Sequence, residues 1–145
     1  GKGYSFIQDN SPAIQIPTIL TERKVAVSPY GDFVRFGGTL EIAGTNQKVN
    51  INRVKGIFES INQYYPTFQA KFPEEEQIWK GLRPCSPDGL PYIGMAPGYE
   101  NVLVGAGHAM LGLTMAPATG RLLTELHQQK ETSLEMKGFE VGRYN

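Results

Sequence analysis

The sequence predicts an α+β chain in which an antiparallel sheet with a packed helix is followed by a strand, a glycine-rich turn and a second helix. Three observations support this fold class. Apolar and polar residues alternate as in strands over much of 4–42, and apolar residues recur at helical spacing over 54–65. Later, an apolar strand at 102–104 leads into closely spaced glycines and then into a second stretch of helical period. This order of elements is typical of α+β proteins.

The first segments are expected to pair as an antiparallel sheet. Tyr4–Gln8 is predicted to be a short strand, and residues 14–20 alternate in the same way but contain Pro17. Because proline cannot donate to a sheet ladder, residues 14–20 are expected at an edge. Segments 24–29 and 33–42 flank a Tyr-Gly-Asp turn, which predicts a hairpin.

The strand at 33–42 is predicted to have one buried and one polar face. Its buried face is expected to carry Val34, Phe36, Leu40 and Ile42. Its polar face is expected to carry Arg35, Thr39 and Glu41. The pair Gly37-Gly38 predicts either a bulge or a close approach of another group to the backbone.

An amphipathic helix is predicted between Val54 and Tyr65, where apolar residues lie three and four positions apart. Asn50 or Asn52 can cap its start. Pro66 ends it, because the residue before a proline disfavours helical geometry. Packing on the sheet is the only role we expect for this helix.

The second half of the chain predicts three short strands, at 77–82, 91–94 and 102–104. A turn with glycines at 105, 107 and 112 follows, and then a helix. The apolar stripe of that helix is predicted to comprise Thr119, Leu122, Leu123 and Leu126. A strand, a tight turn and a helix start present bare backbone N–H groups and the positive end of the helix dipole, which suit an anion.

Composition narrows the classes of function. The formal net charge is +0 and no Lys/Arg run exceeds Arg23-Lys24, so nucleic acid is not an expected partner. The single cysteine fits a reducing compartment, and the first residues show no signal-peptide pattern. The uncharged stretch Val102–Gly120 raises the question of a membrane span, but its glycines, proline and histidine argue against one. The expected location is the cytoplasm, with peripheral binding at the inner face of the membrane as an alternative.

Two motifs carry a resemblance to a known family. WKGLRPCSPDGLPYIG (79–94) and GHAMLGLTMAPATG (107–120) resemble the C-terminal signature of the flavin-dependent D-amino-acid oxidase/dehydrogenase family, which includes glycine oxidase. The match is dense over 79–126, with a weaker echo over 2–44. The resemblance implies that residues 1–78 form part of a substrate (cap) domain and residues 79–145 the C-terminal portion of an FAD-binding domain. No G-x-G-x-x-G occurs, so the N-terminal dinucleotide-binding half is expected to be absent from this chain.

The resemblance also implies roles for particular residues. Arg83 would bind the substrate carboxylate, with a structural arginine paired to Asp88 or a glutamate as the alternative. The pyrimidine edge of a non-covalent FAD would lie against main-chain N–H groups of one segment: His108, Ala109, Met110, Leu111, Gly112, Leu113 and Thr114. No catalytic side chain and no metal ligand is expected. Proton transfer by His108, or a turn that only permits a tight strand–helix junction, remain alternatives.

Three further residues lie within these motifs. Met110 stands where glycine oxidase carries a second substrate arginine, which favours a substrate with some apolar bulk. Cys85 does not align with the cysteine that attaches flavin covalently in sarcosine-oxidase relatives, whose position falls at Gly81. Trp79 is expected to pack in the core, with packing against a ligand as the alternative.

The expected function is therefore oxidation of the C–N bond of D-amino or related imino acids to a 2-oxo acid and ammonia. The electron acceptor, quinone or oxygen, is open, with a slight preference for a dehydrogenase. By itself the chain is expected to be inactive, to hold FAD weakly and to self-associate through surfaces that include the stripe of the last helix. The alternatives are a stand-alone ligand-binding module and an interaction module, both without redox activity.

Overall fold

The structure is a computed structural model that describes residues 1–11 and 13–144. The chain forms two compact units, Gly1–Leu82 and the residues from Arg83 onward. We expected a boundary between 78 and 79. The structure divides four residues later, because β5 (Trp79–Leu82) pairs with the first strand of the chain.

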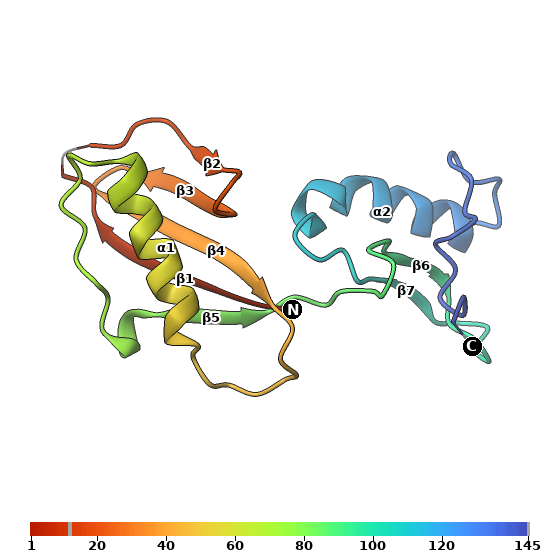
Figure 1. The fold of residues 1–145 in the computed structure, drawn as a ribbon. Coiled ribbons are helices and arrows are strands. Elements are labelled where there is room, and N and C mark those ends of the chain that lie inside the picture. The colour runs from red at the N-terminus through yellow and green to blue at the C-terminus, as the bar shows by residue number, and fades with distance from the viewer. Residues whose placement is uncertain (12, 145) are drawn as a thin grey trace. The chain divides into compact units, whose positions relative to one another are not determined.

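The first unit is built on a five-stranded antiparallel sheet in the order β2-β3-β4-β1-β5 (Figure 1). Its remaining strands are β1 (Lys2–Asp9), β2 (Thr18–Leu20), β3 (Val25–Tyr30) and β4 (Phe33–Glu41). The predicted hairpin of β3 and β4 is confirmed, with Gly31 at φ 59° in its turn. The edge strand expected over 14–20 forms only at its last three residues, beyond Pro17.

One face of this sheet is covered by α1 (Ile51–Tyr64) (Figure 1). The helix buries three apolar residues in the core: Val54, Ile57 and Ile61. At the centre of that core, the ring of Phe36 lies 5.9 Å from Phe6 and 5.5 Å from Phe68 between centroids. A short 3₁₀ helix, η1 (Glu75–Gln77), then leads into β5. Helix, sheet and connector therefore share one hydrophobic core.

The ends of α1 follow the prediction only in part. The helix stops directly before Tyr65 and Pro66, as expected. Asn50 is the N-cap residue, but its side chain makes no capping hydrogen bond. Its carbonyl oxygen accepts instead from the N–H groups of Arg53 and Val54.

An irregularity in β4 reverses which residues face the core. Lys2 pairs with Glu41 but Tyr4 pairs with Gly38, so two steps along β1 oppose three along β4. Such a bulge shifts the alternation by one residue. Glu41 is therefore only 9% exposed, and its carboxylate accepts a 2.9 Å hydrogen bond from the Tyr4 hydroxyl. The prediction that Leu40 and Ile42 share the buried face is wrong, since both are exposed.

The glycine pair that precedes the bulge confirms the predicted close approach. A Cβ on Gly38 would lie 2.9 Å from the carbonyl oxygen of Lys24 and 3.3 Å from Cγ1 of Ile57. The next residue, Thr39, has φ 65°, which is uncommon for a β-branched residue. The close approach thus occurs at Gly38 and the bulge follows directly after it, so both predicted features are present.

The second unit contains β6 (Tyr92–Met95), β7 (Leu103–Ala106) and α2 (Gly112–His127) (Figure 1). The two strands form an antiparallel pair, and α2 packs on them. A Cβ on Gly105 of β7 would lie 2.9 Å from Cγ2 of Thr119 and 3.0 Å from Cδ1 of Leu123. The apolar stripe of α2 thus faces its own strands, and is not the open surface expected to drive self-association.

The C-terminal tail is fastened to the second unit by Arg143. Its guanidinium donates to both carboxylate oxygens of Asp88 at 2.9 Å and lies 3.9 Å above the centroid of the Tyr92 ring. The hydrogen bond from Arg143 holds the pKa of Asp88 well below its usual range. The N–H of Ile93 also donates to the carbonyl of Phe139 at 2.8 Å. The tail is therefore held by a bidentate ion pair.

Candidate functional site

Within the second unit, the structure brings the part of the first motif from Arg83 onward together with the second motif. Cys85 and His108 form an isolated antiparallel bridge, and the N–H of Ala109 donates to the carbonyl of Pro84 at 3.1 Å. Arg83 lies directly before this contact and is half-buried. The loop that begins at Arg83 and the turn that begins at Gly107 are therefore joined by main-chain hydrogen bonds.

The turn between β7 and α2 depends on two residues with left-handed backbone geometry. Gly107 has φ 81° and Ala109 has φ 49°. A Cβ on Gly107 would lie 3.0 Å from Cδ2 of Tyr92, so a larger residue would meet both strain and a clash. The N–H of Leu111 donates to the carbonyl of His108 at 2.9 Å and closes the turn directly before the helix.

The start of α2 presents unused main-chain donors. Leu111 is the N-cap residue and provides no side-chain cap, and the first helical bond runs from Met115 N–H to Leu111 O at 2.9 Å. The N–H groups of Gly112, Leu113 and Thr114 therefore precede the helix's own hydrogen-bond ladder. The helix dipole adds positive potential at the same point.

Exposed apolar side chains surround this helix start. Leu113 is 92% exposed, and Met110 and Leu111 are also exposed. Gly112 leaves room between them, since a Cβ there would meet only Cβ of His108, at an ordinary 3.6 Å. Donors for an anionic or carbonyl edge and apolar contacts for a flat ring system thus lie side by side, an arrangement that fits a flavin.

His108 directs its side chain into the fold. Its Nε2 shares a 2.9 Å hydrogen bond with the hydroxyl of Thr119, a buried residue of α2. This bond ties the turn to the helix and gives the imidazole a structural role. Among the described residues, no group of three His, Cys, Asp or Glu side chains is placed to hold a metal.

The structure also places the other residues that the sequence singled out. Asp88, one of the partners predicted as an alternative for Arg83, forms an ion pair with Arg143. Cys85 is exposed, and its thiol donates to the carbonyl of Arg83 at 3.4 Å. The prediction that Trp79 lies in the core is wrong, because its side chain is 57% exposed. Ile78, one residue earlier and directly before β5, is buried in its place.

Sequence reasoning also missed a group of side chains on the open face of the first unit. Arg35 lies with its guanidinium carbon 5.4 Å from the centroid of the Trp79 ring, and its Nε donates to Ser5 Oγ at 3.1 Å. Arg35 was placed correctly on the polar face of its strand. Its neighbours come from β1 and β5, and no local pattern in the sequence links those strands to β4.

The chain belongs to the FAD dependent oxidoreductase family, whose model matches residues 1–126. The flavin cofactor and the α+β fold inferred from the sequence agree with this assignment. In the part of the chain that the structure describes, neither helix is long and apolar enough to cross a membrane.

Solved structures of three proteins illustrate the similarity. Glycine oxidase from Geobacillus kaustophilus is 26% identical and superposes with a TM-score of 0.81, covering 99% of this chain and 39% of its own. L-proline dehydrogenase from P. horikoshii is 20% identical, with a TM-score of 0.78 and coverage of 96% and 38%. Iminodiacetate oxidase from Chelativorans sp. BNC1 is 18% identical, with a TM-score of 0.76 and the same two coverages. The chain therefore spans about two fifths of the length of each of these proteins.

Proposed function

We propose that the chain is part of a longer flavoenzyme that oxidises the C–N bond of D-amino or related imino acids to a 2-oxo acid and ammonia. Membership of the FAD dependent oxidoreductase family supports the redox class. The names of the similar solved proteins, a glycine oxidase, a proline dehydrogenase and an iminodiacetate oxidase, support an amino- or imino-acid substrate.

The observation that carries this proposal is the hydrogen-bonded contact between the two motifs. The N–H of Ala109 donates to Pro84 O, next to Arg83, and the free donors of the α2 start follow within a few residues. A carboxylate-binding side chain and a flavin-binding backbone would thus be held in a fixed relation by the same turn. Hydride transfer requires the bound substrate and the flavin to be held in a fixed geometry relative to each other.

Within this turn, the main chain would hold the cofactor. The N–H groups of Gly112, Leu113 and Thr114 would donate to the pyrimidine edge, and prealigned donors stabilise negative charge there. When bound, FAD supplies the hydride acceptor. Cys85 lies in the neighbouring loop with its thiol turned to the Arg83 carbonyl, and we propose that attachment is non-covalent.

Arg83 would bind the substrate carboxylate through its planar fork of donors. The side chain is half-buried, so an ion pair there is less screened than on an open surface. We also propose that the first unit belongs to a substrate domain and the second to an FAD-binding domain. The choice between a dehydrogenase and an oxidase depends on whether quinone or oxygen reaches the flavin.

Anaerobic reduction of the flavin in the full-length enzyme tests this function. Paired D- and L-amino acids, glycine and iminodiacetate are mixed with the oxidised enzyme, and the loss of flavin absorbance is followed. We expect D-amino or imino acids to bleach the flavin and the product to be a 2-oxo acid. Bleaching by L-amino acids alone would contradict the D-specific assignment, and no bleaching by any of these acids would contradict the substrate class.

Reoxidation of the reduced enzyme then identifies the acceptor. A dehydrogenase should be reoxidised by a soluble quinone much faster than by dissolved oxygen. Equal or faster reoxidation by oxygen would contradict the dehydrogenase preference without affecting the substrate assignment.

A further inference from the structure

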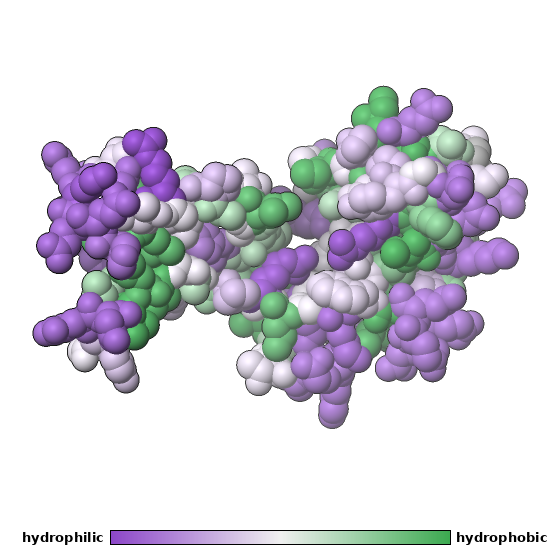
Figure 2. All heavy atoms as spheres, turned by 180° about the vertical axis from the view of Figure 1, so that it is seen from behind, coloured by the Kyte–Doolittle hydropathy of each residue, from purple (hydrophilic) through white to green (hydrophobic). Residues whose placement is uncertain are grey.

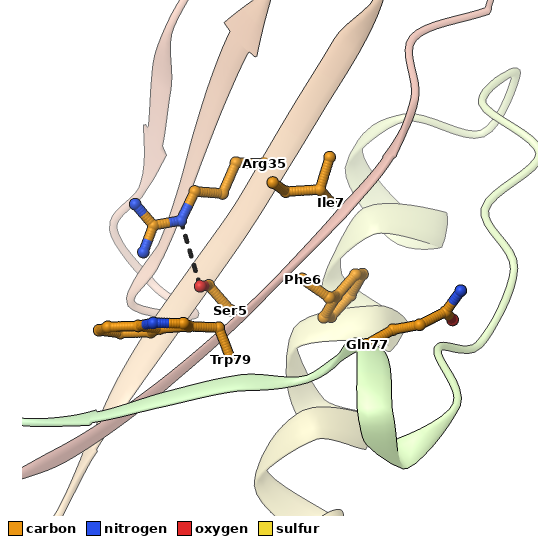
Figure 3. Close-up of a pocket in the computed structure, with 6 residues that line it drawn as sticks. All are labelled: Ser5, Phe6, Ile7, Arg35, Gln77 and Trp79. Atoms are coloured by element: carbon orange, nitrogen blue, oxygen red, sulfur yellow. Dashed lines mark hydrogen bonds between the residues drawn. The ribbon is translucent and has the colours of Figure 1, made fainter.

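The open face of the first unit's sheet carries a hollow that lies entirely within that unit. It has a volume of about 580 Å³ and is lined by Ser5, Phe6, Ile7, Arg35, Gln77 and Trp79. Figure 3 shows Arg35 and Trp79 projecting to the same side of the sheet, with Ser5 between them. Figure 2 views the molecule from behind, on the side opposite to α1, and shows hydrophobic and hydrophilic residues both exposed on this side. The hollow therefore combines a cation with apolar walls.

Small residues on neighbouring strands form the floor of this hollow. Ser5 of β1 pairs with Gly37 of β4 on one side and with Trp79 of β5 on the other. A Cβ on Gly37 would lie 3.3 Å from Cβ of Ser5. A Cβ on Gly81 would collide with the Trp79 ring, so the indole lies across the strand at that glycine. Small residues thus leave space between the guanidinium and the indole.

The guanidinium of Arg35 is oriented but not neutralised. Its Nε donates to Ser5 Oγ at 3.1 Å, and its carbon lies 5.4 Å from the Trp79 centroid. These two contacts fix the plane of the fork and leave both terminal nitrogens directed away from the strand (Figure 3). Ion pairs within the described residues join Arg121 to Glu125 and Arg143 to Asp88, and none involves Arg35.

We propose that this hollow is a binding site for a carboxylate carried on a flat or apolar body. The terminal nitrogens of Arg35 would grip the carboxylate as a fork. The indole of Trp79 and the side chain of Ile7, which pairs with Arg35 across the strands, would contact the body of the ligand. This site goes beyond the proposed function, which assigns carboxylate binding to Arg83, and it lies in the other unit.

The chain supplies its own reporter for this site, because Trp79 is its single tryptophan. Benzoate is titrated into the purified chain while the indole N–H resonance and the tryptophan fluorescence are followed. We expect saturable changes with a Kd of about 1 mM, because a single fork and one ring contact must offset the entropy of association. Benzyl alcohol at equal concentration should have no saturable effect, and acetate should bind about tenfold more weakly for lack of a body.

Variants separate this site from other cations. Arg35→Gln should raise the Kd for benzoate by at least about tenfold, and Arg35→Lys by less, since charge remains but the fork is lost. Arg53→Gln is the matched control, because Arg53 is also exposed and also donates to a hydroxyl, that of Thr39 at 3.4 Å. Arg83→Gln should leave the response unchanged. Circular dichroism confirms that each variant is folded.

The outcomes that would overturn the proposal are distinct. No change in either signal up to about 50 mM benzoate, far above the expected Kd, would exclude the site. Binding that survives Arg35→Gln, or that is lost in Arg83→Gln, would place the carboxylate elsewhere. Acetate or inorganic phosphate binding as tightly as benzoate would show a general anion site without recognition of the body. None of these results bears on flavin reduction by substrate, which tests the proposed function separately.

Discussion

Each of the two units of this chain is stabilised by a different kind of internal contact. The first has a continuous core in which α1, the sheet and the following connector bury aromatic and aliphatic side chains. The second relies on turns, on close contacts at Gly105 and Gly107, and on the bidentate pair of Arg143 with Asp88. Side-chain burial thus stabilises the first unit, whereas backbone geometry shapes the second. Substitutions in the core of the first unit should therefore act mainly on stability, whereas substitutions in the loop and turn of the second unit that carry Arg83 and Gly112 should act mainly on ligand binding.

The largest effect is expected in the core of the first unit. Phe36 is 0% exposed and its ring contacts those of Phe6 and Phe68. Phe36→Ala should lower the free energy of unfolding by about 3–5 kcal/mol, because it removes buried apolar area and leaves a cavity. Urea denaturation of the chain measures this loss. Phe33→Ala on the same strand is the control, since Phe33 is exposed, and a similar loss there would contradict the burial account.

The next effect concerns ligand binding in the second unit. Arg83→Lys should cost about 1.5–3 kcal/mol of substrate binding in the full-length enzyme, because the charge remains but the planar fork is lost. Arg83→Ala should cost more. Steady-state kcat/KM for several amino acids measures both variants. Values within about twofold of the parent, below the scale of one charged hydrogen bond, would show that Arg83 does not hold the carboxylate.

A smaller effect should appear as a pH dependence of the C-terminal tail. Arg143 lowers the pKa of Asp88 in the folded chain, so the folded state binds fewer protons there than the unfolded state. The resulting stabilisation is present above the unfolded pKa of about 3.9 and is lost as pH falls towards the folded value. Hydrogen exchange of the Ile93 N–H, which bonds to Phe139 O, reports the docking of the tail.

The matched variant for this test is Asp88→Asn, which keeps the shape of the side chain but removes the titrating group. Protection of the Ile93 N–H in the parent should be constant from pH 6 down to about pH 4 and should then fall as the pH is lowered further towards the folded pKa of Asp88. Protection in Asp88→Asn should be lower at pH 6 and nearly independent of pH. Equal pH profiles for the two chains would show that the ion pair does not hold the tail.

How much the sequence revealed also differs between the two units. Periodicity predicted α1 and the hairpin of β3 and β4, since both are local patterns. It failed at β4 beyond Gly38, because a bulge shifts every later residue to the opposite face and one residue is enough to do so. Trp79 was misplaced for a different reason. A large aromatic residue was assumed to be buried, whereas the buried residue is Ile78, directly before β5.

The candidate site could be predicted only where it depends on local sequence. The glycine spacing between β7 and α2 correctly indicated a tight turn before a helix start. That the loop at Pro84 bonds to Ala109, and that Asp88 serves Arg143, are contacts between residues far apart in the sequence. Arg35 contacts Ser5 and Trp79 only because β4, β1 and β5 are neighbours in one sheet. The order of strands in a sheet cannot be predicted from any single segment of the sequence.

The central claim is that the turn before α2 binds flavin through its backbone, and two substitutions in the full-length enzyme test it most directly. Gly112→Val should yield a folded protein depleted of FAD, because the added side chain meets no crowding from the chain itself but projects at the helix start. His108→Ala should keep its FAD and most of its activity, since the imidazole is bonded to Thr119. The FAD content per chain and the turnover rate are measured for both. Full FAD content in Gly112→Val, or an activity loss above about a thousandfold in His108→Ala with flavin retained, would contradict the claim, the latter indicating acid–base catalysis by His108.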